Sequence, residues 1–319
     1  MKFAYYPGCS LRESAREFDV SVRAVMERLD VGIEEIPDWT CCGASAADSI
    51  DRHLGQALAV RNLALAEKAS PGLDILVPCS ACYLNLLKAQ RGALADKTTL
   101  AEANALIGHE GLAYTGRTGR VRHLLDVLIN DVGPKAIGDA VQKPLTGISV
   151  APYYGCQILR PYRVFDDPER PTSMEPILAA LGAAIHPWNM GGRCCGASLM
   201  ATHKEAALAS VGQILKAAAT PAGDEAEPGD GADVVATVCP MCQMNLDGYQ
   251  GQALRAGGVG RPVTILYLSQ LIGLAMGLPG DRILMDKNLV VTGGFRSKLA
   301  QPPDARAHHP TPETHRPQP

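Results

Sequence analysis

The amino-acid sequence predicts an α/β fold made of two pseudo-symmetric repeats. Each repeat is expected to be a small parallel sheet with flanking helices and with cysteines at the carboxyl ends of its strands. Three observations predict this fold. Ten cysteines occur as two sets of five in the same order, short apolar runs alternate with helical patterns, and the runs lead to the cysteines. Strands that alternate with helices are typical of parallel sheets with helices on their faces.

The cysteine pattern defines the two repeats. Each set has a single cysteine, then Cys-Cys-Gly-Ala-Ser, then Cys-x-x-Cys followed by an asparagine, which is Asn85 or Asn245. The first set is Cys9, Cys41, Cys42, Cys79 and Cys82, and the second set is Cys156, Cys194, Cys195, Cys239 and Cys242. Because the period is about half of the chain, we interpret the pattern as an internal duplication rather than a solenoid. We expect the halves to face each other across a pseudo-twofold axis.

Short apolar runs are predicted to be the strands that lead to the cysteines. In the first repeat these runs are Lys2–Tyr6, Gly32–Ile36 and Asp74–Pro78. In the second repeat they are Ile148–Tyr153, Ala183–His186 and Asp233–Val238. Because ligands of open α/β sheets gather at the carboxyl ends of the strands, the five cysteines of each repeat should converge at one edge.

Helical patterns separate these strands. A helix is predicted over Ala15–Leu29 because Val22, Val25 and Met26 recur at helical spacing. The other predicted helices are Arg52–Lys68, Ser173–Leu181 and His203–Ala219, with a further helix opening at each Cys-x-x-Cys. The run Val263–Leu278 is predicted to be a strand followed by a buried helix, because it is shorter than the roughly 20 residues that cross a bilayer and contains polar residues.

Three segments lie outside the predicted duplication. Arg91–Gly147 connects the halves and has a helical pattern at Leu124–Val132, whereas Pro221–Gly231 is an acidic surface insertion. From about Phe295 the chain is rich in Pro, His and Arg, which predicts a disordered tail. The predicted domains are residues 1–146 for the first cysteine-rich domain with its connector, 147–294 for the second, and 295–319 for the tail.

Composition excludes several classes of protein. Hydrophobic residues make up 46%, charged residues 20%, and the formal net charge is -3, as in a soluble globular protein. Lys and Arg are scattered along the chain, so no nucleic-acid partner is expected. No run is long enough to predict a transmembrane segment, and the N-terminus lacks the pattern of a secretory signal. We therefore expect a cytoplasmic protein whose thiols are kept reduced.

The cysteines are predicted to bind metal. Structural zinc takes four ligands, commonly from two Cys-x-x-Cys motifs or from cysteine with histidine, whereas each repeat offers five sulfurs with an adjacent pair. Glycines beside them, at positions 8, 43, 155 and 196, would let the backbone approach a bound cluster. We predict an iron–sulfur cluster in each repeat, with zinc and structural disulfides as the alternatives.

The duplicated order of Cys, Cys-Cys-Gly and Cys-x-x-Cys resembles the cysteine-rich CCG domain, and the order over Lys2–Gly277 resembles the B-type subunit of heterodisulfide reductase. The stretch Pro262–Ala275 is similar to the C-terminal segment of that family. The resemblance implies that each five-cysteine set holds a noncubane four-iron, four-sulfur (4Fe-4S) cluster with one bridging thiolate. All ten cysteines fall on the family's ligand positions, and no catalytic residue beyond them is expected.

The resemblance also implies a function. A disulfide or organosulfur substrate would lie between two clusters that each supply one electron, so the chain would be an oxidoreductase subunit acting on a sulfur group. The implied partners are a ferredoxin-like C-type subunit and a flavin-containing A-type subunit. The alternatives are an electron-transfer subunit of a flavoprotein complex that oxidises lactate, glycolate or glycerol-3-phosphate, which uses the same domain, and a metal-stabilised scaffold without redox turnover.

Two tryptophans and one histidine are further candidates. Trp39 and Trp188 precede the Cys-Cys pairs and are expected either to screen the clusters from water or to be ordinary core residues. His186 is expected either to donate a proton to a leaving thiolate or to be structural. The tyrosines before the first cysteine of each set carry no predicted role.

Overall fold

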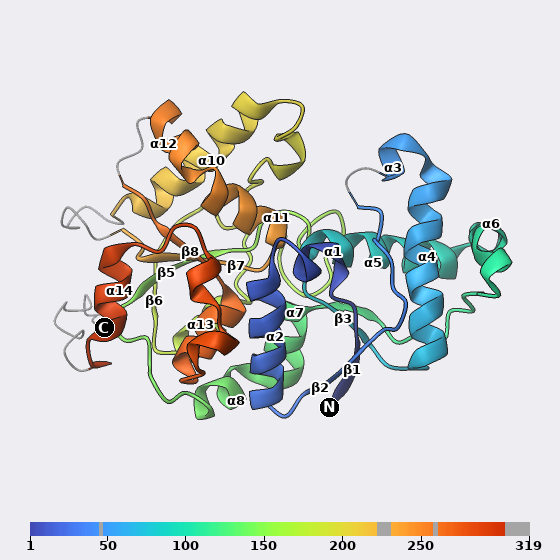
Figure 1. Ribbon diagram of the computed structural model, residues 1–319, viewed down its shortest axis with the longest axis horizontal. Coiled ribbons are helices and arrows are strands. Elements are labelled where there is room, and N and C mark those ends of the chain that lie inside the picture. Colours follow the sequence, from blue (N-terminus) through green and yellow to red (C-terminus); the bar gives the residue numbers. More distant parts are fainter. Residues whose placement is uncertain (45–46, 222–230, 258–260, 304–319) are drawn as a thin grey trace, which may run out of the picture.

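Two four-stranded parallel sheets, one in each half of the chain, form the centre of the protein (Figure 1). The computed structural model describes residues 1–44, 47–221, 231–257 and 261–303. The first sheet has the strand order β2-β1-β3-β4 and the second has the order β6-β5-β7-β8. The same order in both sheets, with helices on their faces, confirms the predicted α/β fold and its duplication.

The six predicted strands are present, and no strand end differs from its prediction by more than one residue. The strands of the first sheet are β1 (Lys2–Tyr5), β2 (Gly32–Glu35), β3 (Ile75–Val77) and β4 (Val121–His123). The strands of the second sheet are β5 (Ser149–Tyr153), β6 (Ala184–Ile185), β7 (Val234–Thr237) and β8 (Thr264–Tyr267). In each sheet the strands run parallel in register, so their carboxyl ends lie at one edge.

Helices follow the strands in both repeats. Those of the first repeat are α1 (Gly8–Arg12), α2 (Arg16–Arg28), α3 (Ala47–Ile50), α4 (Arg52–Ala69), α5 (Ser80–Ala95), α6 (Lys97–Ile107), α7 (Leu124–Val127) and α8 (Gly133–Asp139). Those of the second are α9 (Glu175–Ala180), α10 (Lys204–Ala219), α11 (Pro240–Gln243), α12 (Gln250–Gly257), α13 (Leu268–Ala275) and α14 (Gly293–Ala300). Short π-helical turns occupy Leu128–Val132 and Met244–Gly248.

The repeats pack together through equivalent helices. In Figure 1, α2 and α13 lie side by side, and Ser21 Oγ is 2.7 Å from Ser269 Oγ between them. The ring of Phe18 on α2 stacks on Tyr267 with 4.0 Å between centroids. The counterpart of α2 in the second repeat, α9, packs against α8 and the π-helical turn after α7. This reciprocal packing is what a pseudo-twofold relation between the repeats produces.

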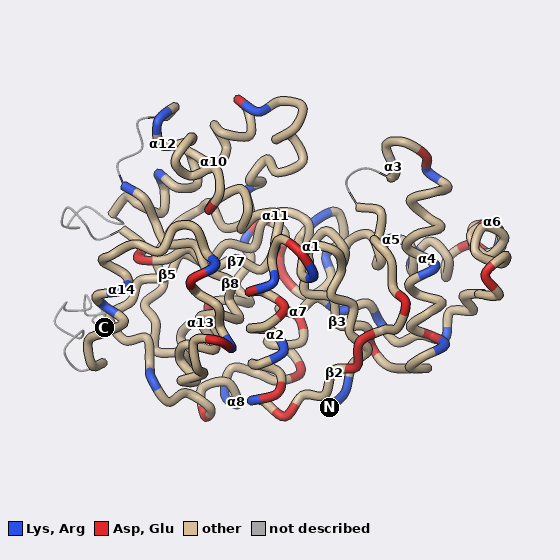
Figure 2. Tube along the Cα trace, viewed as in Figure 1, with Lys and Arg blue, Asp and Glu red and all other residues tan. Residues whose placement is uncertain are grey.

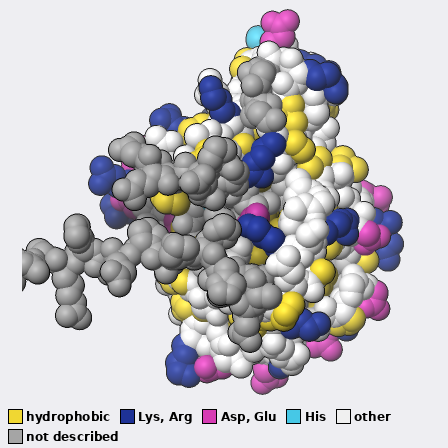
Figure 3. All heavy atoms as spheres, turned by 90° about the vertical axis from the view of Figure 1, so that its left-hand side faces the viewer, with side chains coloured by type: hydrophobic (Ala, Val, Ile, Leu, Met, Phe, Trp, Pro, Cys, Tyr) yellow, Lys and Arg dark blue, Asp and Glu magenta, His cyan; other side chains and the backbone are white. Residues whose placement is uncertain are grey.

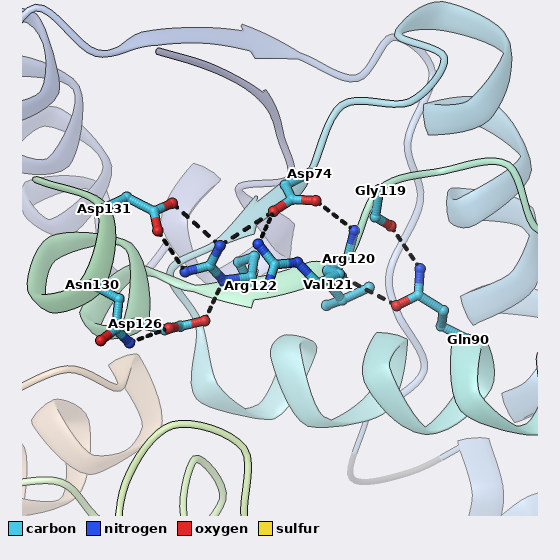
Figure 4. Close-up of polar contacts among 9 residues, drawn as sticks. All are labelled: Asp74, Gln90, Gly119, Arg120, Val121, Arg122, Asp126, Asn130 and Asp131. Atoms are coloured by element: carbon cyan, nitrogen blue, oxygen red, sulfur yellow. Dashed lines mark hydrogen bonds and ion pairs between the residues drawn. The ribbon is translucent and has the colours of Figure 1, made fainter.

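The duplication extends further than predicted. The connector Arg91–Gly147 was expected to lie outside it, but β4 joins the first sheet and leads into α7, as β8 leads into α13. Strand β4 was missed because its middle residue is Arg122. Figure 4 shows why this arginine can be buried: Asp74, Asp126 and Asp131 surround its guanidinium, with Asp131 Oδ1 3.1 Å from Nη2.

The predicted tail is wrong for its first residues. Residues 293–300 form α14, and Phe295 is only 1% exposed. The Thr292 hydroxyl accepts a hydrogen bond from the Phe295 backbone N–H, and Lys298 Nζ lies 2.8 Å from Asp233 Oδ2. Burial of Phe295, the Thr292 cap and the Lys298–Asp233 ion pair therefore stabilise a helix in a segment whose composition predicted disorder. Residues 304–319 of the predicted tail and 222–230 of the predicted insertion lie outside the described residues.

Charged side chains are distributed over both repeats. Figure 2 shows Lys and Arg interleaved with Asp and Glu along the trace. On the face drawn in Figure 3, basic, acidic and apolar side chains are interspersed. In the part of the chain that the structure describes, none of the helices has the length and apolar character needed to cross a membrane.

Candidate metal centres

The first repeat gathers its five cysteine sulfurs at the carboxyl edge of its sheet. Side-chain hydrogen bonds link the thiols into one chain, in the order Cys9, Cys41, Cys42, Cys82 and Cys79. The single cysteine lies in α1 just after β1, the pair lies in the loop after β2, and the Cys-x-x-Cys joins β3 to α5. Five residues spread over 74 positions thus meet in one place.

The second repeat has the same arrangement. Cys156 is hydrogen-bonded to Cys194, and Cys195 Sγ lies 3.6 Å from Cys242 Sγ. The Cys239 thiol is hydrogen-bonded to Cys242, and its charge acts on Cys156. All ten cysteines carry free thiols. The structure therefore brings together both predicted sets, and none of the ten is stranded.

Each site is open at one end and buried at the other. Cys9, Cys41 and Cys194 are exposed and Cys156 is half-buried, whereas the six remaining cysteines are buried. The open end is formed by the single cysteine and the first cysteine of the pair. The Cys-x-x-Cys motifs form the closed end, where the two repeats meet.

Two tyrosines fasten the loops that carry the cysteine pairs. The Tyr6 hydroxyl donates to the carbonyl oxygen of Thr40 at 2.6 Å, and the Tyr153 hydroxyl donates to that of Arg193 at 2.6 Å. Each acceptor immediately precedes a Cys-Cys pair. Both tyrosines are fully buried, so each hydroxyl is paired in the core as buried polar groups require. No role was predicted for these residues, and only their equal placement before the first cysteine of each set could have indicated one.

Two asparagines fasten the same loops from the other side. The side-chain amides of Asn85 and Asn245 donate to the carbonyl oxygens of Cys42 and Cys195, respectively. Each asparagine lies three residues after a Cys-x-x-Cys, so it ties the helix that begins there to the Cys-Cys loop. The recurrence of Asn after both motifs is therefore structural support for the sites.

Glycines permit the closest backbone approach to the sulfurs. Gly8 and Gly155 have φ of +74° and +70°, in the left-handed region that favours glycine. A Cβ added to Gly8 would lie 2.8 Å from Cys82 Sγ, and one added to Gly155 would lie 3.0 Å from Cys242 Sγ. A side chain at either position would occupy space beside the sulfurs.

The tryptophans lie against the tyrosines that fasten the loops. The ring of Trp39 packs edge-on against Tyr6 at 5.4 Å, and Trp188 lies 6.2 Å from Tyr153. Both indole N–H groups are satisfied, by Glu35 and by the carbonyl oxygen of residue 152. The tryptophans thus pack against the tyrosines whose hydroxyls bond to the Cys-Cys loops.

His186 is held by backbone rather than by sulfur in this structure. Its Nε2 lies 3.3 Å from the carbonyl oxygen of Ala217, and its ring lies edge-on to Trp188. Burial lowers the pKa of His186. These contacts match the structural role that was one of its two expected roles.

Because the thiols are crowded together, some have lowered pKa values and others have raised ones. Hydrogen bonds from Cys42 and Cys9 lower the pKa of Cys41 to about 2, and one from Cys156 lowers the pKa of Cys194 to about 6. The thiols that donate these bonds, such as Cys9, have raised pKa values. Because thiolates this close together repel each other, the full set can ionise only beside a cationic group, so metal binding would release protons.

The donor sets fit an iron–sulfur group. Among the described residues, no group of three or more His, Cys, Asp or Glu is placed to hold a metal ion in the way a single ion would require. A polynuclear cluster differs, because its thiolate ligands are distributed around several irons. Backbone N–H groups also point at the sulfurs, with Gly43 N and Gly196 N each 3.4 Å from the first cysteine of its pair.

A cavity of about 400 Å³ opens beside the first site. It lies between α4, α5 and α6, and its lining includes Asn85, the residue that fastens the Cys-Cys loop. Arg52, His53 and Lys88 line it together with one acidic residue, Glu102. The cavity therefore has room for a small molecule and an excess of basic groups.

Comparison with known proteins agrees with this geometry. The family model for CCG, the cysteine-rich domain, matches residues 3–87 and 150–247, one match in each repeat. A Helicobacter pylori crystal structure described as a hypothetical protein has a similar fold, with a TM-score of 0.67 at 13% identity. The similarity covers 90% of this chain but only 51% of that one, so this chain spans about half of its length.

Three relatives match almost the whole chain. The 8-methylmenaquinol:fumarate reductase membrane anchor subunit of Wolinella succinogenes is 35% identical over 91% of this chain and 97% of its own. The heterodisulfide reductase B-subunit-like protein of Archaeoglobus profundus is 27% identical over 89% and 93%. The B-subunit of the ferredoxin:CoB-CoM heterodisulfide reductase of Methanosarcina mazei is 26% identical over 93% and 97%. The chain therefore belongs to the cysteine-rich CCG domain family, with one copy of the domain in each repeat, and it is similar over almost its whole length to B-type subunits of heterodisulfide reductases.

Proposed function

We propose that this protein is the iron–sulfur subunit of a heterodisulfide reductase-like oxidoreductase complex, with one cluster in each five-cysteine site. The observation that carries the proposal is the meeting of two all-thiol sites at their buried ends. Both sites have the same loop supports, and Ser80 in the first Cys-x-x-Cys hydrogen-bonds to Val238, the residue before the second. Two redox groups so placed would be close enough to exchange electrons.

The ten cysteines are the proposed ligands, five to each site. We propose a noncubane four-iron, four-sulfur cluster in each, as the resemblance to heterodisulfide reductase B-type subunits implies; five thiolates, one more than an ordinary cubane cluster takes, are consistent with it. When bound, each cluster supplies one-electron transfer. The protein holds the ligand loops through the tyrosine and asparagine hydrogen bonds, and it buries the Cys-x-x-Cys end away from water.

The proposed reaction is the cleavage or formation of a disulfide or related organosulfur bond. Cleavage of a disulfide takes up two electrons and two protons and yields two thiols, so two adjacent one-electron sites match its requirement. The exposed cysteines mark the ends at which a substrate can approach. The basic cavity beside Asn85 suits an anionic group of such a substrate.

Partner subunits must supply or accept the electrons. We propose a ferredoxin-like C-type subunit and a flavin-containing A-type subunit, as the sequence resemblance implies. The name of the Methanosarcina relative, which couples ferredoxin to a heterodisulfide, supports an iron–sulfur partner. A cytoplasmic location remains the expectation from the sequence.

A second candidate function is electron transfer without sulfur chemistry. The Wolinella relative has the highest identity of the three, 35%, and its name assigns it to a complex that couples a quinol to fumarate. In such a complex the same two clusters would pass electrons between partner subunits. This candidate belongs to the same class as the flavoprotein complexes considered from the sequence.

Turnover separates the two candidates. The protein would be prepared anaerobically, and its iron and sulfide content measured. Reduced viologen dye would then be offered with organic disulfides or with a menaquinone analogue. Dye oxidation that depends on the disulfide, and is lost in both Cys42→Ser and Cys195→Ser, is the expected result. Iron-loaded protein that reacts with the quinone analogue alone would favour the second candidate, and protein that binds zinc in place of iron would contradict both.

A further inference from the structure

A single buried side chain connects the closed ends of the two sites. Ser80 lies between Cys79 and Cys82 of the first site and is 1% exposed. Its hydroxyl donates to the carbonyl oxygen of Val238 at 3.1 Å. Because Val238 immediately precedes Cys239, a residue of the first site contacts the backbone that carries a cysteine of the second.

His123 orients this hydroxyl. The histidine ends β4 and is fully buried; its Nδ1 accepts from the Leu125 N–H at 3.1 Å, and its Nε2 is 3.3 Å from Ser80 Oγ. Burial lowers the pKa of His123 to about 4, so the ring is neutral near pH 7. Since Nδ1 is the acceptor, the hydrogen-bond pattern assigns the proton to Nε2, which faces Ser80 Oγ. The ring also hydrogen-bonds to the backbone of Pro78 and Val238, which holds it in place. The hydroxyl proton of Ser80 is then free to point toward the second repeat.

The sulfur of Cys239 is the other acceptor within reach. The Cys239 thiol forms side-chain hydrogen bonds with Cys242 and with Ser80. Hydrogen bonds to ionised acceptors are stronger than those to neutral ones. A Cys239 that ligates metal is a thiolate, so it would then be a stronger acceptor for the Ser80 proton than the neutral carbonyl oxygen of Val238, which accepts it in this structure.

The duplication does not reproduce this contact in the opposite direction. Ser80 corresponds to Pro240, which has neither a hydroxyl nor a backbone N–H. His123 corresponds to Tyr267 at the end of β8, whose ring stacks on Phe18. The two sites have the same cysteines, but Pro240 has no donor with which to make the equivalent hydrogen bond from the second site to the first.

We propose that Ser80, oriented by His123, is a positioning residue that donates a hydrogen bond to the Cys239 thiolate and makes the second site the more easily reduced of the two. The inference rests on the proposed function, because it needs a cluster in each site. A hydrogen bond to a ligand sulfur stabilises the more negative, reduced state and raises the reduction potential. Electrons that enter the chain then reduce the second site before the first, although the two sites have the same set of cysteines.

A redox titration of the full chain followed by EPR tests this inference. Cys42→Ser and Cys195→Ser assign the two signals to their sites. In Ser80→Ala, the ratio of reduced to oxidised second site at a fixed applied potential should fall roughly tenfold, the effect of losing one hydrogen bond to a charged group. For a one-electron couple this corresponds to a potential lower by about 59 mV. The signal of the first site should not move, and Ser80→Thr, which keeps the hydroxyl, should restore part of the shift.

Ser21→Ala is the matched control. Ser21 is also buried, and its hydroxyl also bonds across the repeat boundary, to Ser269 at 2.7 Å. It should leave both potentials unchanged. His123→Gln, which disturbs the orientation of the same hydroxyl, should lower the second-site potential in the same direction and serves if Ser80→Ala does not fold. Iron-loaded protein in which Ser80→Ala moves neither signal, or moves both equally, would overturn the inference alone. Wild-type protein without iron would overturn the proposed function with it.

Discussion

The side chain of Asn245 donates a hydrogen bond to the carbonyl oxygen of Cys195 at 2.9 Å, and both groups are buried beside the second site. The equivalent bond in the first repeat joins Asn85 to Cys42. The two bonds are independent, so each repeat offers a control for the other.

Asn245→Ala should weaken the second site and spare the first. The substitution leaves the Cys195 carbonyl without its partner, at a cost of about 1–3 kcal/mol to the free energy of unfolding. With a chelator present, iron should be lost faster from the second site, as followed by its EPR signal. Asn85→Ala should do the same to the first site. Equal loss from both sites in either variant would show that the asparagines do not act locally.

Gly8→Ala should prevent the first site from loading. The new Cβ would lie 2.8 Å from Cys82 Sγ, closer than a carbon and a sulfur can approach without displacement. Gly72→Ala is the matched control, because Gly72 also has a positive φ, +78°, but nothing lies within 4 Å of the added Cβ. The iron content of Gly8→Ala should fall to about half that of wild type, whereas Gly72→Ala should keep full iron with a modest loss of stability. Full iron in Gly8→Ala would contradict the close approach.

Burial of His123 should make stability depend on pH. Its pKa is lowered from 6.5 to about 4, so between these values the unfolded chain binds a proton that the folded chain does not. Stability from this residue is therefore constant above about pH 6.5 and falls as the pH drops toward 4, by a total of roughly 3 kcal/mol. Urea unfolding at several pH values should show a shallower acid loss in His123→Gln. Parallel pH curves for the two proteins would contradict a neutral buried ring.

Arg122 and Arg120 form a second matched pair. Arg122 is buried among Asp74, Asp126 and Asp131, whereas the side chain of Arg120 is 73% exposed and contacts only Asp74 among these three (Figure 4). Arg122→Met leaves the buried carboxylate of Asp126 without its ion-pair partner and should cost about 3–5 kcal/mol in unfolding free energy. Arg120→Met should cost no more than about 1 kcal/mol. Similar losses in thermal unfolding would show that burial of the network is unimportant.

The features that the cysteines mark could be predicted from the sequence. The strands and helices around each motif follow from apolar runs that lead to a cysteine, and the type and order of the ten cysteines predicted the two sets that the fold brings together. Strand β4 was missed because Arg122 interrupts the apolar run, and one of its three neutralising partners, Asp74, lies 48 residues away. Helix α14 was missed because a single anchor, Phe295, outweighs a composition typical of disorder.

The supporting side chains could not be predicted in the same way. Tyr6 and Tyr153 have a role only because folding brings the carbonyl oxygens before each Cys-Cys pair to their hydroxyls. The contact from Ser80 to Val238 joins residues 158 positions apart. Every residue has a backbone carbonyl, so the residue that accepts such a hydrogen bond can be of any type. A single sequence therefore does not reveal the contact.

Iron and sulfide analysis with EPR on anaerobically prepared wild type, Cys42→Ser and Cys195→Ser tests the central claim most directly. If each five-cysteine site holds one four-iron cluster, wild type should contain about eight irons per chain. Each variant should contain about half as much, with one EPR signal lost and the other kept. Loss of both signals in a single variant, iron unchanged in either, or zinc as the bound metal would contradict two separate iron–sulfur sites.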